Sequence, residues 1–389
     1  MAQRFMLGIE EEFQLVDAKT GKLASRAQSI LDKGAPIFEE QIKPEMLQSV
    51  LEFVSPVLPD IGAARMELYT SRALLARILQ KENLALISAG THPSSSWHEQ
   101  KPTPHERYME LEEEYQDVAR SILIFGLHVH VSVDSKEQAI QVMNQVRTWL
   151  PHILALSSNS PFWNGRMTGI KSYRSVVWKR FPRSGTPDIF ENLEHFDRFV
   201  NDLVEMECID NGKKIWWDIR PHPFFDTIEF RISDMPATIE DTLALAALCQ
   251  ALIAKLVKMN EKGEKVPILS RDYIDENKWR AMRYGLDAEV VDFTNKRRAS
   301  MRDSFRELLD LVDDVVDELG SRREMDYIRA LLDDPRGTGA DRQMEAFRQT
   351  NDPDKVSHFL MEQTMQGVQL DDAMLYDKFI RFKPYEASI

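Results

Sequence analysis

Three short apolar runs of this chain carry charged or imidazole side chains at every second position. The polar pairs are Glu10 and Glu12 in GIEEEFQLV, His128 and His130 in FGLHVHVSV, and Glu229 and Arg231 in TIEFRIS. Successive side chains of a β-strand point to opposite faces, so each run would present a polar pair on one face and apolar groups on the other. If the three strands share one sheet, these polar groups converge on a single surface, which we interpret as a site.

Such a surface needs cations. Two carboxylates about 4 Å apart repel each other by roughly 4 kcal/mol at an effective dielectric constant near 20. We therefore expect divalent metal, and we add Glu52, a third acid in the strand-like LEFVSP, to the ligands. Glu11 lies on the apolar face and is left out. Carboxylates with one or two histidines suit Mg²⁺ or Mn²⁺ better than Zn²⁺. The alternatives are an exposed edge strand for Glu10 and Glu12, ordinary core histidines, and a surface pair for Glu229 and Arg231.

Basic residues are segregated between residues 160 and 187. This stretch holds six basic residues and no acidic one, in a chain whose net charge is −14, and its glycines predict a loop. Segregated charge favours binding of phosphate or carboxylate, although a solvated basic loop is the alternative. Magnesium beside such a loop suggests ATP, yet the chain contains neither a Walker motif nor the kinase signatures. We assign nucleotide binding to Arg166, Lys171, Arg174 and Arg231, and catalysis to Arg231, Arg174 and Arg220.

The order of predicted elements indicates an α+β protein. Strands are expected at 6–16, 47–54, 84–90, around His128, at 214–220 and at 227–233. Helices are expected at 61–81, 105–122, 136–157, from Thr238 onward and at 298–319. The acidic net charge argues against nucleic-acid binding. No apolar run approaches 18 residues, so we expect no membrane association and a cytoplasmic location. The two cysteines support neither a disulfide framework nor a zinc–thiolate site. Unpaired sheet edges make a homo-oligomer reasonable.

Six motifs occur in order over roughly residues 5 to 260: GIEEEFQLV, LEFVSP, GLHVHVSV, LSSNSPFWNG, WWDIRPHP and IEFRISD. Together they closely resemble the bacterial carboxylate–amine ligases of the YbdK type, the glutamate–cysteine ligase type 2 family of the glutamine synthetase-like superfamily. The C-terminal third resembles the family mainly through GTGADRQ. The resemblance implies a curved antiparallel sheet that forms a funnel flanked by helices, with a catalytic core over 1–260 and a mainly helical portion over 261–389. It also implies ATP and two or three magnesium ions, with Arg231 contacting phosphate and the metal held by Glu10, Glu12, Glu52, His128 and Glu229.

The function expected from this resemblance is ATP-dependent amide formation through an acyl phosphate, with weak glutamate–cysteine ligase activity. The substrates would be a small glutamate-like carboxylate and an amine, and arginines such as Arg231 and Arg174 would stabilise the developing oxyanions. Three alternatives stay open from the residues. They are a kinase of a small guanidino or carboxylate substrate, a zinc-dependent hydrolase that uses His128 and His130, and a binding or regulatory protein of weak activity.

Overall fold

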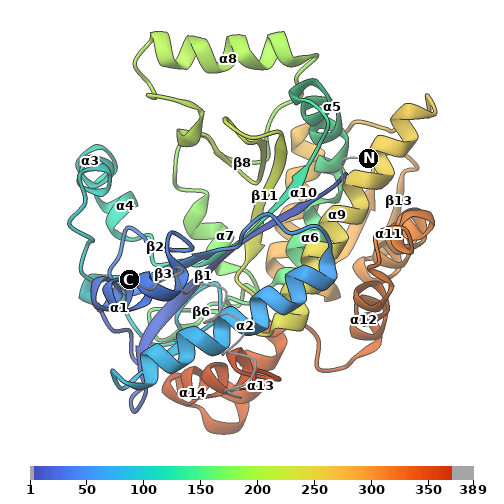
Figure 1. The fold of residues 1–389 in the computed structure, drawn as a ribbon. Helices are drawn as coiled ribbons and strands as arrows, with labels where there is room; N and C mark the ends of the chain where they lie inside the picture. The colour runs from blue at the N-terminus through green and yellow to red at the C-terminus, as the bar shows by residue number, and fades with distance from the viewer. Residues whose placement is uncertain (1–3, 370–389) are drawn as a thin grey trace, which may run out of the picture.

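A seven-stranded antiparallel sheet forms the centre of the computed structural model, which describes residues 4–369 (Figure 1). The strand order is β10-β11-β5-β1-β3-β2, and β4 also pairs with β1. The strands are β1 (Leu7–Asp17), β2 (Ile42–Pro44), β3 (Val50–Val54), β4 (Leu84–Ile87), β5 (Gly126–Ser132), β10 (Ile219–Pro221) and β11 (Thr227–Asp234). Because β1 pairs with β3, β4 and β5, it sets the registers on which the site depends.

One face of this sheet is covered by helices, as the alternation of its strands requires. The helices are α2 (Ile61–Gln80), α5 (Lys136–Val146), α6 (Leu150–Ser157) and α9 (Ile239–Glu261). Apolar strand residues such as Ile9, Phe13 and Val129 are fully buried beneath them. Among the described residues, α9 alone is long and apolar enough to cross a membrane, but 83% of its apolar window is buried inside the molecule. It is the central core helix that its all-round apolar sequence predicts.

Glu11 points into this covered face. Its carboxylate forms a fully buried ion pair with Arg72 of α2 and accepts a hydrogen bond of 3.1 Å from the hydroxyl of Thr242 in α9. The guanidinium of Arg72 also donates to the carbonyl oxygens of Ala237 and Thr364, each at 3.1 Å. A buried charge needs such compensation. Glu11 therefore links the sheet to its covering helices, whereas Glu10 and Glu12 lie on the opposite face of β1.

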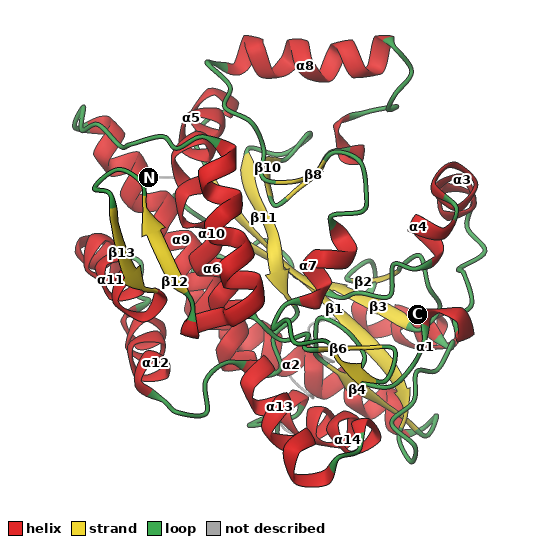
Figure 2. Ribbon diagram, turned by 180° about the vertical axis from the view of Figure 1, so that it is seen from behind, coloured by secondary structure: helices red, strands yellow, loops and turns green. Residues whose placement is uncertain are grey.

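Up to residue 369, the C-terminal part adds five α-helices and one hairpin. They are α10 (Arg271–Tyr284), β12 (Glu289–Asp292), β13 (Arg297–Ser300), α11 (Met301–Val316), α12 (Arg322–Asp333), α13 (Gly339–Thr350) and α14 (Pro353–Thr364). Helices α11 and α12 pack on α9, and α14 packs on β4. Figure 2 shows the β12–β13 hairpin beside α11, at the edge of the molecule. The helical character of this part agrees with the sequence, whereas a domain boundary at residue 260 stays a prediction.

The segment 160–187, predicted as a loop, contains regular structure, and this part of the prediction is wrong. It holds β6 (Phe162–Trp163), β7 (Arg166–Met167), α7 (Tyr173–Trp178) and β8 (Ser184–Gly185), the last paired with β9 (Trp216–Trp217). The buried carboxylate of Asp234 anchors the segment, because it accepts hydrogen bonds from the Asn159 amide and the hydroxyls of Ser160 and Ser172 at 2.7–2.8 Å. The partner that orders the segment is therefore distant in the sequence.

Other predicted boundaries also shift. The helix expected at 105–122 is two, α3 (Glu106–Tyr115) and α4 (Asp117–Arg120), because Gln116 between them has φ 48°. The helix expected at 136–157 is divided into α5 and α6 by a 3₁₀ turn at Arg147–Trp149. The strand expected at 214–220 is divided into β9 and β10. Helices α1 (Ala27–Phe38) and α8 (Leu193–Glu205) were not predicted.

Candidate active site

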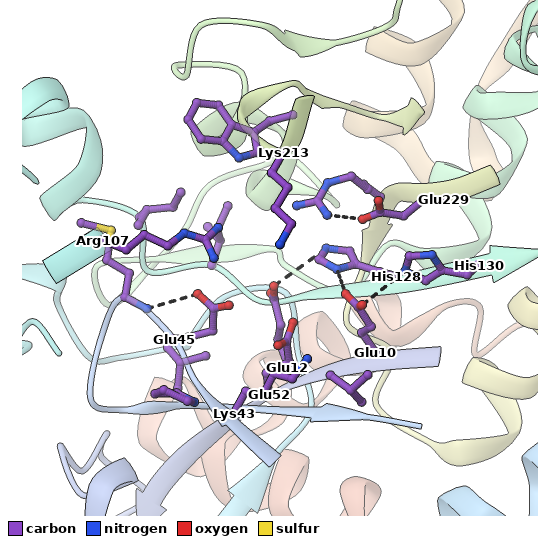
Figure 3. Close-up of a pocket in the computed structure, with 18 of the residues that line it drawn as sticks. Glu10, Glu12, Lys43, Glu45, Glu52, Arg107, His128, His130, Lys213 and Glu229 are labelled. Atoms are coloured by element: carbon purple, nitrogen blue, oxygen red, sulfur yellow. Dashed lines mark hydrogen bonds and ion pairs between the residues drawn. The ribbon is translucent and has the colours of Figure 1, made fainter. Parts of the chain in front are cut away.

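The polar faces of β1, β3, β5 and β11 meet in one cavity of about 840 Å³ (Figure 3). Antiparallel register places Glu10 opposite His128, Glu12 opposite Glu52, and Glu229 opposite His130. Within the cavity, Nδ1 of His128 lies 2.8 Å from Oε2 of Glu10, and Nε2 of His130 lies 3.2 Å from Oε1 of the same carboxylate. The two-residue alternation seen in the sequence therefore builds a compact cluster.

All five residues predicted to bind metal belong to this cluster, in two groups that share one imidazole. Ligand atoms of Glu10, His128 and Glu229 lie within 4.8 Å of one another, and so do those of Glu12, Glu52 and His128. Carboxylate oxygens with a neutral imidazole are suitable ligands for a hard divalent cation. The donor set therefore fits Mg²⁺ or Mn²⁺.

Two acids of the cluster, Glu12 and Glu52, lack enough positive charge beside them. Burial, followed by the charge of Glu45, raises the pKa of the Glu12 carboxyl to about 7. Burial and the nearby charge of Glu10 raise the pKa of Glu52 well above its ordinary range. Glu10 differs, because hydrogen bonds from His128 and His130 outweigh its burial and lower its pKa. Burial and the charge of Arg231 lower the pKa of His128 to about 4, so this imidazole is neutral at physiological pH and able to ligate.

Two arginines flank Glu229. Arg231, on the same strand, pairs with Oε1 of Glu229, and its guanidinium carbon lies 5.7 Å from the centre of the Trp178 ring. Arg220, from β10, donates to Oε2 of Glu229 at 2.7 Å and to the carbonyl oxygen of Ile215 at 2.7 Å. These partners occupy Arg220, whereas the buried Nε atom of Arg231 has no hydrogen-bond partner among the described residues. The pair of arginines also lowers the pKa of the Glu229 carboxyl well below its ordinary range, against the effect of burial.

Arg174 is the third arginine of the cavity and comes from α7. Its guanidinium donates to the carbonyl oxygens of Arg231 and Ile232 at 3.1 and 3.3 Å. Space for it depends on Gly126, because a Cβ atom there would lie 2.3 Å from Nη2 of Arg174. The amide of Gly126 also donates to the Glu12 carboxylate. One glycine thus positions a cation and an acid of the same site.

The other predicted nucleotide ligands lie elsewhere. Arg166 is exposed on β7, and neither it nor Lys171 lines the cavity. The ammonium of Lys171 pairs with Asp287 at 2.7 Å and with Asp341 of GTGADRQ at 2.6 Å. Of the six basic residues in the segment, Arg174 alone lines the cavity. Charge segregation in the sequence did not reveal that the remaining bases have partners or positions outside the site.

Several cavity residues were missed in the sequence. The most informative are Lys43 and Glu45 at β2, Arg107 on α3, Lys213 on η3 (Gly212–Lys214) and His222 after β10. Glu45 is half-buried beside the cluster, and its Oε2 accepts a hydrogen bond of 3.1 Å from the Met46 amide. Lys43 and Glu45 follow the same two-residue alternation as Glu10 and Glu12, which was the available signal. A strand of only three residues, however, is too short to be identified by alternation.

The chain is also similar in sequence to known proteins. A protein of Chloroflexus aurantiacus, provisionally named glutamate–cysteine ligase 2, is 49% identical over 364 residues, which cover 94% of this chain and 93% of that protein. One of Solibacter usitatus with the same provisional name is 48% identical over 363 residues, covering 93% and 94%.

Two solved structures have the same fold at low sequence identity. The glutamate–cysteine ligase of Francisella tularensis, solved with AMP, superposes with a TM-score of 0.73 at 13% identity and covers 97% of this chain and 92% of that one. The bifunctional glutathione synthetase of Pasteurella multocida gives 0.70 at 12% identity, covering 94% and 53%. The predicted fold class is thereby confirmed. The family model described as glutamate–cysteine ligase family 2 matches residues 6–363, and the chain belongs to that family.

Proposed function

We propose that this protein is an ATP-dependent carboxylate–amine ligase that forms an amide bond through an acyl phosphate. The observation that supports this most is the convergence of Glu10, Glu12, Glu52, Glu229 and His128 on one face of the sheet, in an open cavity with arginines beside them. Membership of the glutamate–cysteine ligase family supports the same reaction class.

In this proposal the five residues would hold Mg²⁺ or Mn²⁺, which would neutralise phosphate charge during phosphoryl transfer. A substrate carboxylate oxygen attacks the γ-phosphorus of ATP, ADP leaves, and an acyl phosphate forms. The amine then attacks the carbonyl carbon, and inorganic phosphate leaves as the amide forms. The cavity residues need no nucleophile of their own, since both bonds are made by substrate atoms.

The arginines have separate roles in this reaction. Arg231 would stabilise charge on the transferred phosphoryl group, because its planar guanidinium lies beside a proposed metal-ligand carboxylate and its Nε has no partner among the described residues. Arg174 would act from the side of Glu12, because the positive charge of Arg174 favours the ionised form of the Glu12 carboxyl. Arg220 is a positioning residue, since its hydrogen bonds go to Glu229 and backbone carbonyls. Arg166 and Lys171 have no part in this proposal.

The names of the relatives indicate which substrates to test first. Because the curated relatives are provisionally named glutamate–cysteine ligase 2, glutamate and cysteine are the first pair to test, and we expect weak activity with them. A cavity of about 840 Å³ is near the upper end of ordinary ligand pockets. It can therefore hold a nucleotide together with a second small molecule. We place the reaction in the cytoplasm, where ATP and amino acids are available.

The test is a screen for phosphate release in which amino acids and other carboxylates are crossed with amines in the presence of Mg²⁺ and ATP. A ligase gives release that requires both a carboxylate and an amine, with an amide as product. Glu12→Gln serves as the inactive control, and Glu113→Gln, a change on the exposed side of α3, as the active one. Turnover that yields a phosphorylated product without an amine would show a kinase. Turnover without ATP would show a hydrolase, and tight nucleotide binding without turnover would show a regulatory protein.

A further inference from the structure

The motif GTGADRQ, residues 337–343, plays no part in the reaction proposed above, and none of its residues lines the cavity. It forms the start of α13, where Oδ2 of Asp341 accepts hydrogen bonds of 3.0 Å from both the amide and the hydroxyl of Thr338. The other carboxylate oxygen of Asp341 pairs with the Lys171 ammonium at 2.6 Å. One carboxylate therefore caps α13 and attaches it to the segment 160–187.

A second contact joins the motif to the chain just before that segment. The buried side-chain amide of Gln343 donates to the carbonyl oxygen and to the side-chain oxygen of Asn159, at 2.9 and 2.6 Å. The amide of Ala340 donates to the carbonyl oxygen of Ser158 at 2.9 Å. The two chains approach closely, because a Cβ atom at Gly339 would lie 2.2 Å from Oδ1 of Asn159. The motif thus holds the start of the segment as well.

Both contacts lead to Arg174 through short hydrogen bonds. The Ser160 amide donates to the carbonyl oxygen of Lys171 at 3.0 Å, which joins the two places that the motif contacts. The Ser160 hydroxyl in turn accepts a hydrogen bond of 3.0 Å from the Arg174 amide. Helix α7 begins at Tyr173, two residues after Lys171. A shift of Lys171 or Ser160 would therefore move the helix that carries Arg174.

Arg174 depends on this support because few contacts hold its side chain. The guanidinium is buried, donates to the carbonyl oxygens of Ile232 and Arg231 at 3.3 and 3.1 Å, and has an Nε without a hydrogen-bond partner among the described residues. Two bonds to neutral carbonyl oxygens are weaker than a bidentate pair with a carboxylate. The place of the guanidinium is therefore set largely by the backbone of α7.

We propose that Asp341 and Gln343 are positioning residues, which fix the Arg174 guanidinium beside the metal-ligand cluster from outside the cavity. The proposal rests on the ligase function proposed above and on the role given there to Arg174. Neither positioning residue touches a substrate. Their loss should nevertheless slow the reaction, since a misplacement of about 1 Å caused far from the chemistry can cost about a hundredfold in rate.

The kinetic experiment compares wild type, Asp341→Asn and Gln343→Met with the active substrate pair from the screen. Asparagine removes the charge that pairs with Lys171 but keeps an oxygen that can accept from Thr338, and methionine keeps the length of glutamine without its donor. Each variant should lower kcat by at least about tenfold. Arg348→Gln is the control, because Arg348 lies on the exposed side of α13 and should keep the wild-type kcat.

Combination with Arg174→Gln distinguishes positioning from a general loss of stability. If Asp341 acts through Arg174, Asp341→Asn should change the kcat of Arg174→Gln by less than about twofold, whereas independent effects would multiply. Effects that multiply would show that Asp341 acts by another route. A lower melting temperature with an unchanged kcat in the single variants would show that the motif only stabilises the fold. Either result would overturn the proposal.

Hydrogen exchange in the protein without ligand gives a readout that needs no turnover. Asp341→Asn and Gln343→Met should speed exchange of the Tyr173 and Arg174 amides, which donate to Ser160, by at least about tenfold over wild type and Arg348→Gln, with β5 unchanged. Unchanged protection of these amides in both variants would overturn the proposal. If no substrate pair releases phosphate even with wild type, the ligase function fails, while exchange still decides whether the motif holds α7.

Discussion

Replacing Glu12 by glutamine should stabilise the metal-free protein while it abolishes activity. The Glu12 carboxylate is mostly buried, with 15% of the side chain exposed, lies near Glu45 and Glu52, and has no metal to balance its charge in the apo state. Glutamine keeps the shape of the side chain and an oxygen that can accept from the Gly126 amide, but it removes the charge. The variant therefore measures the cost of placing this charge in the folded protein, which comes first from burial and then from repulsion by Glu45.

The size of the effect follows from the pKa of Glu12. Its value of about 7 in the folded protein, against an ordinary 4.5, corresponds to about 3 kcal/mol at about 1.4 kcal/mol per unit. Because the folded pKa is the higher one, the folded state holds an extra proton between these values. Stability is retained below about pH 4.5 and is lost as the pH rises toward about 7. An unfolding entropy of about 0.8 kcal/mol/K for this chain length converts 3 kcal/mol into a melting shift of about 4 °C.

The assay is thermal unfolding of wild type, Glu12→Gln and the surface control Glu113→Gln in excess chelator. The gain for Glu12→Gln over wild type should be about 4 °C at about pH 8 and close to zero at about pH 4.5, while the control stays at wild-type values. Saturating Mg²⁺ should remove most of this difference, since a metal present at a hundredfold excess over its dissociation constant stabilises wild type by about 2.7 kcal/mol. A variant that melts below wild type in chelator at pH 8, or a difference that does not change with pH, would refute the reasoning.

Three further outcomes are expected. ATP should raise the melting temperature only with Mg²⁺ or Mn²⁺, because the acids repel bare triphosphate; an equal shift in excess chelator would exclude a metal-dependent site. Arg231→Lys keeps the charge but loses the planar fork, so it should lower kcat more than it raises the KM for ATP. An unchanged kcat with a higher KM would restrict Arg231 to ground-state binding. Gly126→Ala should displace the Arg174 guanidinium, because the added Cβ would lie 2.3 Å from it. The displacement should lower kcat by at least about tenfold, or about 1.4 kcal/mol of barrier. An unchanged kcat would show that catalysis does not depend on this position of Arg174.

Most residues of the cluster could be predicted from the sequence because they lie on β-strands. In β1, β5 and β11 the two-residue period separates polar from apolar side chains over several positions, which identifies both the strand and its site-facing residues. Register then follows from packing, since a slip of one residue would bury the acids and expose the apolar set. This explains why residues as distant as Glu10 and Glu229 could be predicted to converge.

The basic residues could not be placed in the same way. A charged side chain in an irregular segment has no periodicity to show its direction, and its partner is set by tertiary structure. Lys171 and Arg174 are three positions apart, yet the first pairs with Asp341 outside the cavity and the second lines the cavity. Arg107 lies on a short amphipathic helix with no sign that it faces a site. Such positions depend on the packing of α3 and α7, which local sequence does not reveal.

The adjacent acids Glu11 and Glu12 offer a last test of this account, because they lie on opposite faces of β1 and should respond with opposite sign. Glu11→Gln leaves the buried guanidinium of Arg72 without its counter-charge, and breaking a buried pair in this way costs about 3–5 kcal/mol. With the unfolding entropy used above, the melting temperature should fall by about 4–6 °C, whereas Glu12→Gln should raise it in the metal-free protein. The folded Glu11→Gln protein should still gain stability from Mg²⁺ and ATP, since the cluster on the other face keeps its ligands. If both variants shifted the melting temperature in the same direction in excess chelator, the division of β1 into a site face and a core face would be wrong.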